Sequence, residues 1–402
     1  MHETYDSQLL TSRAALPTQP LAPRLGIIGG GQLARLTAMS ALQLGCDVVV
    51  LEKNAFSPAA TLATHSLLGD WNTAEALLDL AGRVDVVTLE NEFVPAELLA
   101  ILEKGGHLVL PGARSLGLVQ DKLTQKQTLK SAGLPVPRMR SVPDFATFAR
   151  AVEELGLPCL LKARRNAYDG KGNVTVRSVS DLAPAWERLG GPAGNPLFVE
   201  EFCNFSRELA TIITRGRAGE TATYPVVETV QRNHVCHLVR APAPIEPAIA
   251  QRAAELARQA VEAVGAVGSY GVEMFLTSDG QLLLNELAPR VHNSGHYTIE
   301  ACVCSQFENH VRAVLGLPLG STRMLAPAAV MVNLLGTVRA PGRPLGLERA
   351  LAVPATHVHL YGKAVCGIGR KMGHVTALGA TLAEAEQAAT RCAAEIHFGP
   401  PS

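Results

Sequence analysis

The feature that most constrains this chain is a β-hairpin signal that brings two acidic side chains face to face. Two apolar runs in the segment SYGVEMFLTSDGQLLLNE flank an Asp-Gly dipeptide at 279–280, which favours a two-residue type I′ turn. Such a turn pairs Ser278 with Gln281, and counting outward then places Glu273 opposite Glu286. Opposed like charges destabilise an antiparallel pair, and a divalent cation such as Mg²⁺, which takes carboxylate and phosphate oxygens, suits the space between them. The alternative is an accidental pair with one solvated glutamate, and the hairpin alone leaves both interpretations open.

The residues after the hairpin are rich in polar chemistry and poor in core-forming side chains. They read NELAPRVHNSGHYT between Asn285 and Thr298. Arg290, His292 and Asn293 offer cationic and neutral donors that suit a small planar oxyanion. A structural histidine is the alternative for His292, but its position just after a predicted metal ligand favours a functional role.

Composition excludes several classes of partner. The chain has 402 residues, more than one hydrophobic core usually supports, so we expect two or three domains. Its 36 Lys and Arg residues balance 36 Asp and Glu residues, and no run of 18 apolar residues occurs, so neither nucleic acid nor a membrane is expected as a partner.

Eight scattered cysteines without a CxxC pair are typical of reduced thiols in a cytoplasmic protein. Residues 1–24 lack an apolar segment, and we interpret them as a flexible N-terminal extension.

The order of β-rich and helical segments predicts an α/β region followed by an α+β region. From Leu25 short apolar runs alternate with helical stretches, which is typical of a parallel sheet, and we assign 25–115 to a Rossmann-like domain. Residues 116–321 mix further strands with helices and include a smaller subdomain at about 138–202. Residues 322–402 are predicted to form a small, β-rich C-terminal domain.

A first glycine cluster, GGGQLA at 29–34, satisfies GxGxxA between a predicted strand and a predicted helix, and Glu52 ends the next strand. Read alone, this pattern indicates a nicotinamide or flavin dinucleotide site. Its physical basis is less specific, because glycines let any ligand phosphate approach the N-terminus of a helix. A tight turn without a ligand is the third interpretation.

A second cluster, KARRNAYDGKGN at 162–173, has too few residues between its glycines for a GxxxxGK[ST] phosphate loop. A strand-turn-strand hairpin with glycines at its tip can instead fold over a triphosphate. Lys162 and Lys122 would then supply ammonium groups, although a solvated surface role is the alternative for each lysine alone. Together with the two opposed glutamates, these lysines supply the groups that a site for ATP and Mg²⁺ needs.

A third cluster, LYGKAVCGIGRKMGH, places Lys363, Arg370 and Lys371 in a segment interrupted by glycines. A phosphate monoester on a substrate would explain these three permanent cations. A solvated basic loop would explain them equally well.

Together these segments resemble the ATP-grasp enzymes and, within them, the N5-carboxyaminoimidazole ribonucleotide synthetase family. The matching stretches are GGGQLARL, DKLTQKQ, AYDGKGN, NELAPRVHNSGHYT, SQFENHVRA and GRKMGH, which follow the family's order from about Leu25 to Leu378. The resemblance implies an ATP-grasp fold with an N-terminal Rossmann-like preATP-grasp domain and a small β-rich C-terminal domain. It also implies ATP- and bicarbonate-dependent carboxylation of the 5-amino group of 5-aminoimidazole ribonucleotide through carboxyphosphate, with release of ADP and phosphate.

The resemblance also assigns roles to residues. It implies ATP contacts, with the adenine at 200–203 and the ribose at Glu208, from Lys122, Lys162, Tyr168, Asp169, Gly170, Lys171, Gly172, Asn173, Glu200, Glu201, Phe202, Cys203, Glu208, Gln231, Asn285 and Glu286. It implies ribonucleotide contacts from Gln32, Leu33, Glu90, Tyr168, Lys363, Arg370 and Lys371. Mg²⁺, or Mn²⁺ in its place, would bind Glu273 and Glu286; bicarbonate would meet the catalytic residues Arg290, His292 and Asn293; and Asp169 would be the general base. A cytoplasmic homodimer is expected.

Three positions depart from the family pattern. The segment around Glu90 reads TLENEFVP where TYEFENVP is expected, Gln231 stands where histidine is usual, and Ala34 replaces a glycine. Two alternatives for the whole chain remain. A Rossmann oxidoreductase would explain GxGxxA and Glu52 but not the other clusters, and a non-catalytic nucleotide-binding protein would not need the full set of ligands.

Overall fold

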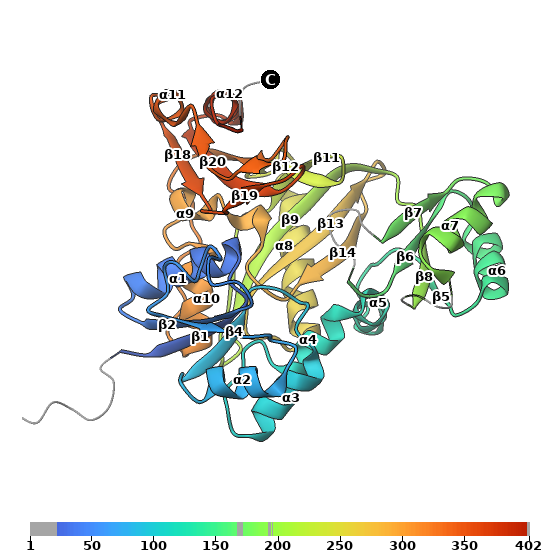
Figure 1. Ribbon diagram of the computed structural model, residues 1–402. Coiled ribbons are helices and arrows are strands. Elements are labelled where there is room, and N and C mark those ends of the chain that lie inside the picture. Colours follow the sequence, from blue (N-terminus) through green and yellow to red (C-terminus); the bar gives the residue numbers. More distant parts are fainter. Residues whose placement is uncertain (1–21, 167–171, 192–193, 195, 400–402) are drawn as a thin grey trace, which may run out of the picture.

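The computed structural model describes residues 22–166, 172–191, 194 and 196–399 (Figure 1). Four predicted site residues, Tyr168, Asp169, Gly170 and Lys171, lie outside the described residues, as does most of the predicted N-terminal extension. Among the described residues, no helix combines the length and the apolar character needed to cross a membrane.

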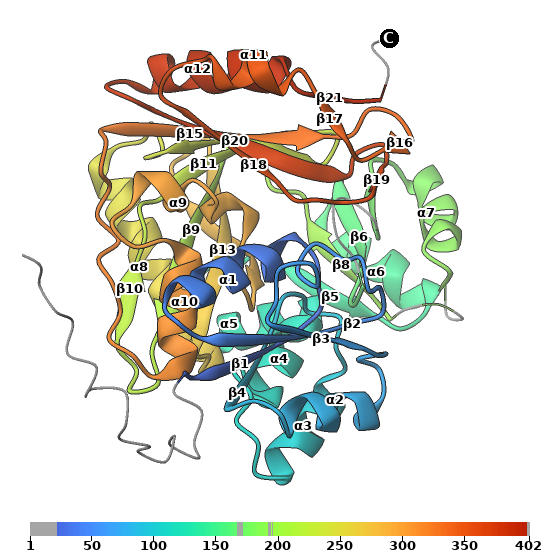
Figure 2. The same cartoon turned by 60° about the vertical axis from the view of Figure 1, so that its left-hand side comes forward.

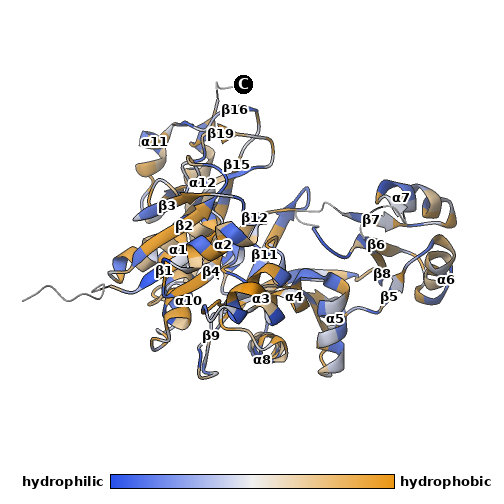
Figure 3. Cartoon of the chain, turned by 60° about the horizontal axis from the view of Figure 1, so that its bottom comes forward, coloured by the Kyte–Doolittle hydropathy of each residue, from blue (hydrophilic) through white to orange (hydrophobic). Residues whose placement is uncertain are grey.

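The N-terminal unit is a four-stranded parallel sheet in the order β3-β2-β1-β4. Strands β1, β2 and β4 are nearly continuous apolar runs because both faces of the sheet are covered there, and Figure 3 shows the apolar colour of β1 and β2. The edge strand β3 is largely exposed. Helices α1 and α10 pack on one face, and α2 and α3 pack on the other. The elements are β1 (Arg24–Ile28), α1 (Gln32–Gln43), β2 (Asp47–Glu52), β3 (His65–Leu68), α2 (Ala74–Ala81), β4 (Val86–Leu89), α3 (Ala96–Lys104) and α4 (Ala113–Gln120).

A smaller antiparallel sheet follows, in the order β5-β8-β6-β7, and projects away from the rest of the molecule (Figure 1). Helices α6 and α7 cover one face, where Phe148 and Trp186 stack with ring centroids 5.8 Å apart. The elements are α5 (Lys122–Ser131), β5 (Met139–Val142), α6 (Phe145–Leu155), β6 (Cys159–Ala163), β7 (Asn173–Val176), η2 (Val179–Asp181), α7 (Leu182–Arg188) and β8 (Leu197–Glu201).

A nine-stranded sheet forms the centre of the molecule, in the order β14-β13-β9-β11-β12-β15-β20-β18, with β10 beside β9. Helix α8 covers β9, β13 and β14, with alanines and valines at helical spacing turned inward. The elements are β9 (Phe205–Arg215), β10 (Thr221–Thr223), β11 (Val227–Arg232), β12 (Val235–Ala241), α8 (Pro247–Val264), β13 (Gly268–Thr277), β14 (Leu282–Ala288), η4 (Asn293–Gly295), α9 (Thr298–Ala301) and α10 (Gln306–Leu315).

The C-terminal strands continue this sheet, because β12 pairs with β15 (Figure 2). Helix α12 covers β15 and β20, and its N-terminus is capped by Thr381, whose hydroxyl accepts the Glu384 N–H. The sequence did not reveal that the middle and C-terminal regions share one sheet. The remaining elements are β15 (Ala328–Leu335), β16 (Ala340–Pro341), β17 (Pro344–Leu345), α11 (Leu347–Leu351), β18 (Thr356–Leu360), β19 (Val365–Cys366), β20 (Lys371–Gly379), α12 (Leu382–Ala394) and β21 (His397–Phe398).

The turn of the β13–β14 hairpin differs from the predicted one. Thr277 N donates to Gln281 O over 2.9 Å, and Gly280 N donates to Thr277 O over 3.0 Å, so the loop has three residues, 278–280. Gly280 adopts φ +81°, the left-handed conformation that ends such loops. The predicted two-residue type I′ turn is therefore wrong.

The predicted pairing of Glu273 with Glu286 is nevertheless confirmed. The longer loop shifts the register by one residue, so Met274 pairs with Leu284. A β-bulge then adds Asn285 to β14 and shifts the register back at Glu273. The pairing arises from two irregularities that compensate, and the turn alone does not produce it.

Candidate active site

Glu273 and Glu286 form the centre of the candidate site. They face away from α8, while their neighbours Val272 and Leu287 pack beneath the sheet. Burial, and then the charge of Glu286, raise the pKa of Glu273 to about 7. Such a pair would be stabilised by a dication, and two carboxylates with nucleotide phosphates are a usual ligand set for Mg²⁺. Across the described part of the chain, no group of three or more His, Cys, Asp or Glu side chains could hold a metal ion.

Lys122 lies beside this pair. It is the first residue of α5, whose N-terminus is capped by the Asp121 carboxylate through the N–H groups of Leu123 and Thr124. The Lys122 Nζ lies 2.6 Å from Glu286 Oε2. Burial lowers the pKa of Lys122, but the neighbouring carboxylates outweigh it and the net shift is upward. The ammonium group therefore stays charged next to the proposed metal ligands.

Glu200 has two lysine partners. The carboxylate is 1% exposed, with Lys126 Nζ 2.5 Å from Oε1 and the Lys162 ammonium paired with Oε2. Its side chain is thus occupied, and its main chain lies between β5 and β6, opposite Met139 and Leu160. Sequence analysis missed Lys126, although its spacing of four residues from Lys122 places both on one face of α5.

The other residues predicted to contact adenosine lie nearby on β8, β9 and β11. Glu201 accepts from Arg138 N and Nε over 2.7 and 2.6 Å, while Phe202 is partly exposed. Burial raises the pKa of Glu208, and a hydrogen bond from Gln231 opposes the shift. Gln231, which stands where the family usually has histidine, therefore contacts the predicted ribose ligand.

Arg290 is held by Glu92. Its Nε and Nη2 donate to the two Glu92 oxygens over 2.6 and 3.1 Å, and Nη1 donates to the Val291 carbonyl over 3.2 Å. Burial raises the pKa of Glu92, but the guanidinium outweighs it and lowers the pKa overall. The sequence alone had assigned no role to Glu92.

His292 is a neutral donor beside the acidic pair. Its Nδ1 lies 2.9 Å from Ser294 Oγ and accepts from Ser294 N over 3.4 Å, so the proton resides on Nε2, which lies 3.5 Å from Glu273 Oε1. Burial, together with the charge of Arg290, lowers the pKa of His292 well below its usual value. Asn293 exchanges two amide hydrogen bonds with Asn333 on β15, over 3.0 and 2.7 Å.

The first glycine cluster binds the protein's own carboxylates. Glu90 accepts the N–H groups of Gly31 and Ala34 over 2.6 and 3.0 Å, and Glu52 accepts Gly30 N over 2.7 Å. A Cβ on Gly31 would lie 2.5 Å from Glu90 Oε1. Internal carboxylates therefore take the place in which a dinucleotide phosphate would sit at the start of α1, and they account for these glycines.

The three basic residues of the third cluster lie in and beside the loop between β18 and β20. Lys363 Nζ donates to Lys371 O over 2.7 Å, and Arg370 Nη1 donates to Val365 O over 2.7 Å. The neighbouring Tyr361 packs in one small core with Leu33 of α1, Val291 and Phe307. This core joins the start of α1, the segment after β14 and the basic loop, so the three predicted substrate-binding segments converge.

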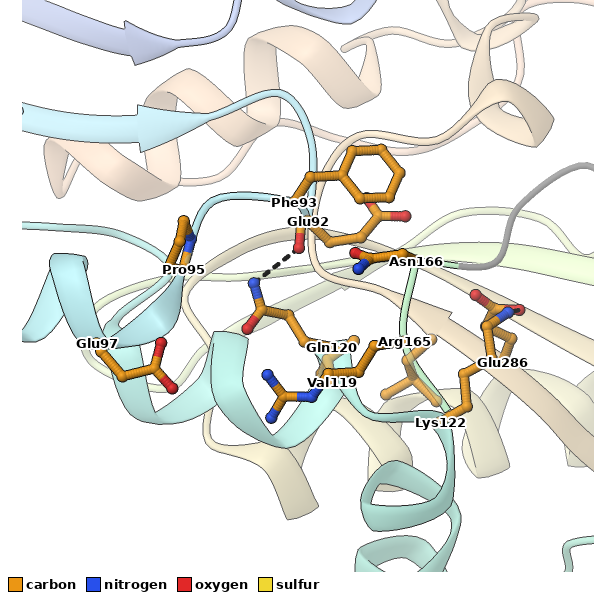
Figure 4. Close-up of a pocket in the computed structure, with 11 residues that line it drawn as sticks. Glu92, Phe93, Pro95, Glu97, Val119, Gln120, Lys122, Arg165, Asn166 and Glu286 are labelled. Carbon is orange, nitrogen blue, oxygen red and sulfur yellow. Dashed lines mark hydrogen bonds and ion pairs between the residues drawn. The ribbon is translucent and has the colours of Figure 1, made fainter. Parts of the chain in front are cut away.

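A cavity of about 180 Å³ opens beside Lys122 and Glu286 (Figure 4). Its other walls come from the segment 92–97, the end of α4, Arg165 and Asn166, and Leu287. Gln120 closes part of this wall by donating from Nε2 to the carbonyl oxygens of Glu92 and Val94 over 2.7 and 2.5 Å.

Most of the chain matches known protein families. Family models match for the ribonucleotide synthetase preATP-grasp domain over residues 23–120, the ATP-grasp domain over 127–307 and the phosphoribosylaminoimidazole carboxylase C-terminal domain over 329–388. The N5-carboxyaminoimidazole ribonucleotide synthase of Synechococcus elongatus is 42% identical over 375 residues, which cover 92% of this chain and 94% of that protein.

Solved structures agree with this sequence similarity. N5-carboxyaminoimidazole ribonucleotide synthetase from Thermotoga maritima superposes with a TM-score of 0.84 at 40% identity, over 93% of this chain and 99% of that one. The Aspergillus clavatus synthase in complex with ADP and 5-aminoimidazole ribonucleotide superposes with a TM-score of 0.85 at 37% identity, over 92% and 97% of the two chains.

The fold and the acidic and basic groups of the site define an ATP-grasp ligase. Within this class, the chain belongs to the N5-carboxyaminoimidazole ribonucleotide synthase family. The resemblance inferred from the sequence motifs is confirmed, as is the fold class. The Rossmann oxidoreductase alternative is wrong.

Proposed function

We propose that the protein uses ATP and bicarbonate to carboxylate the 5-amino group of 5-aminoimidazole ribonucleotide, with release of ADP and phosphate. One contact carries the proposal: His292 Nε2, in the predicted oxyanion-binding set, lies 3.5 Å from Glu273 Oε1, in the predicted metal-binding pair. Bicarbonate at the first would meet the ATP γ-phosphate at the second. Attack of a bicarbonate oxygen on that phosphorus would displace ADP and give carboxyphosphate. Carboxyphosphate would then release phosphate and CO₂, and the amine would attack the CO₂ carbon and lose a proton.

ATP would lie between the small antiparallel sheet and the central sheet. Lys122 and Lys162 would neutralise phosphate charge, Glu208 would hold the ribose, and the chain at 200–203 would contact the adenine. Mg²⁺, or Mn²⁺, would bind Glu273 and Glu286 and would offset the charge of the triphosphate. Metal binding can be followed without turnover, because Mn²⁺ should give an altered electron paramagnetic resonance signal with wild-type protein and ADP but not with Glu273→Gln.

Bicarbonate would be oriented by Arg290, His292 and Asn293. A guanidinium and a neutral imidazole donor suit an oxyanion because neither presents negative charge to it. Lys363, Arg370 and Lys371 would hold the ribonucleotide phosphate. Gln32, Leu33 and Glu90 would contact the same substrate from the N-terminal unit. The role of Asp169 as general base stays a prediction.

A homodimer in the cytoplasm stays a prediction for this chain. The location is supported by the cysteines, because six of the eight are buried thiols, as is usual in a reducing compartment. Sedimentation at several protein concentrations would measure the oligomeric state.

The decisive experiment is product analysis after incubation with ¹³C-labelled bicarbonate. ADP and phosphate should appear only when ATP, bicarbonate and 5-aminoimidazole ribonucleotide are all present, and the label should enter the ribonucleotide. Steady ATP hydrolysis that does not respond to the ribonucleotide would contradict the proposal.

A further inference from the structure

Two buried glutamines hold the main chain at either side of the site. Gln306, the first residue of α10, is fully buried; its Nε2 donates to His292 O over 2.7 Å and its Oε1 accepts His292 N over 2.9 Å. Gln125 in α5 does the same to Leu287, donating to its O over 3.0 Å and accepting its N–H over 2.8 Å. Each amide thus satisfies both main-chain groups of one residue, as a neighbouring β-strand would.

The two residues held in this way, Leu287 and His292, lie next to different parts of the proposed site. Leu287 follows the proposed metal ligand Glu286 on the edge strand β14, where its outward main-chain groups would otherwise lack a strand partner. His292 is itself one of the predicted bicarbonate ligands. Gln125 therefore acts on the ATP side and Gln306 on the bicarbonate side.

The surroundings of Gln306 leave little freedom to the residue it holds. A Cβ on Gly271 would lie 2.5 Å from the His292 Cβ, and a Cβ on Gly295 would lie 2.7 Å from the Gln306 Cδ. Two glycines therefore make room for the clamp and for the imidazole. Because the main chain of His292 is fixed and its Nδ1 is engaged by Ser294, the Nε2–H has one direction in which to point.

The Gln306 side chain is not needed to start its own helix. Ser305 already caps α10, because its hydroxyl accepts the Glu308 N–H over 3.1 Å. The other polar neighbour of the Gln306 amide is His296, whose Nδ1 lies 3.3 Å from Nε2. Burial lowers the pKa of His296 to about 3, so this imidazole stays neutral at the pH of the experiments below.

We propose that Gln306 is a positioning residue for bicarbonate and that Gln125 is the corresponding positioning residue for the ATP side. This inference rests on the proposed function, in which His292 contacts bicarbonate and Glu286 lies at the ATP phosphates. Neither glutamine touches a substrate in this scheme, and each acts through the main chain it holds.

The test compares Gln306→Met with Gln125→Met, which both remove the two hydrogen bonds to the held residue at similarly buried sites. Gln125→Met also removes the bond that Nε2 donates to Val119 O over 3.1 Å. Gln306→Met should raise KM for bicarbonate or lower kcat by about 10- to 100-fold while KM for ATP stays within about twofold of wild type. Gln125→Met should show the reverse pattern. If both variants change the kinetic constants for ATP and for bicarbonate to the same extent, the inference is overturned, because such a result would indicate only a general structural role.

Gln306→Glu gives a second measurement that does not depend on how well the methionine variants fold. A protonated carboxyl can replace the amide, since its O–H donates to His292 O and its C=O accepts His292 N, whereas a carboxylate can only accept. Burial should raise the pKa of the new carboxyl toward neutrality. The ratio of Gln306→Glu activity to wild-type activity, measured at the same pH and bicarbonate concentration, should therefore rise severalfold as the pH falls from 8 to 6. A ratio that does not change with pH would overturn the inference.

The wild-type assay separates this inference from the proposed function. If wild-type protein turns over ATP without requiring bicarbonate, the proposed function fails and the inference fails with it. If wild-type turnover requires bicarbonate but Gln306→Met keeps wild-type KM and kcat for it, only the positioning role fails.

Discussion

Glu286 bonds to Lys122 across 164 residues of sequence, with Nζ 2.6 Å from Oε2, while it faces Glu273 on the neighbouring strand. The lysine occupies one side of the carboxylate and the second glutamate occupies the other. In this structure the ammonium group supplies positive charge that a nucleotide-bound metal ion would supplement during turnover.

The first prediction concerns this carboxylate. Glu286→Ala should lower kcat at least about 100-fold, because it removes a proposed metal ligand and the partner of Lys122. The fold should persist, since the Glu286 side chain is 32% exposed and lies on an edge strand. Steady-state kinetics and circular dichroism would measure the two effects. Glu97→Gln, at an exposed residue that lines the same cavity, is the matched control and should keep near wild-type kinetics.

A second prediction concerns the buried carboxylate of Glu200. Glu200→Gln should destabilise the protein by about 3–5 kcal/mol, because it leaves the ammonium of Lys126, itself 2% exposed, without its counter-charge. Urea denaturation would measure the loss. The double variant Glu200→Gln, Lys126→Met should recover part of the stability, since it removes the more buried of the two ammonium groups that Glu200 neutralises and leaves only Lys162 without its partner. A double variant less stable than the single one would contradict this account.

Local patterns in the sequence predicted that Glu273 pairs with Glu286 but not how the hairpin achieves this pairing. The Asp-Gly signal does not distinguish a two-residue turn from a three-residue loop with a bulge, because glycine at the last loop position suits both. The bulge at Asn285 depends on pairing along the whole of β14, which lies beyond any short motif. The correct pairing was therefore reached through an incorrect turn.

The glycine cluster shows a different limit. Main-chain N–H groups at a helix N-terminus can donate to any anion, so the motif does not reveal whether a ligand phosphate or a protein carboxylate accepts these hydrogen bonds. Here the acceptor is Glu90, 59 residues from Gly31. Long-range partners such as Glu92 and Arg290, 198 residues apart, leave no local signal at all. Lys126 did leave one, in its helical spacing from Lys122.

A third prediction follows from His310, which joins two structural units. Its Nδ1 accepts Ser269 N over 3.0 Å, so Nε2 carries the proton and lies 2.9 Å from Thr88 Oγ1 on β4 of the N-terminal sheet. Burial lowers the pKa of His310 to about 4 in the folded protein, against about 6.5 when unfolded.

Between those two pKa values the unfolded chain binds a proton that the folded protein does not. The stabilisation is therefore complete above about pH 6.5 and declines as the pH falls toward 4. Between pH 7 and pH 5 this histidine should account for about 2 kcal/mol of lost stability. Urea denaturation of wild type and His310→Asn at both pH values would isolate the contribution of His310 to the free energy of unfolding, because the variant should lack this part of the pH dependence. Equal pH dependence of the two proteins would contradict the assignment.

The last prediction concerns the bidentate pair of Glu92 and Arg290. Arg290→Lys cannot keep two parallel hydrogen bonds to the carboxylate, and Glu92→Gln removes the charge that orients the guanidinium. Each single variant should lower kcat/KM for bicarbonate at least about tenfold. If Glu92 acts by orienting Arg290, the losses should not add, and the double variant should show a coupling energy of about 0.5–3 kcal/mol. Strictly additive losses would mean that Glu92 and Arg290 act on bicarbonate independently, despite their contact.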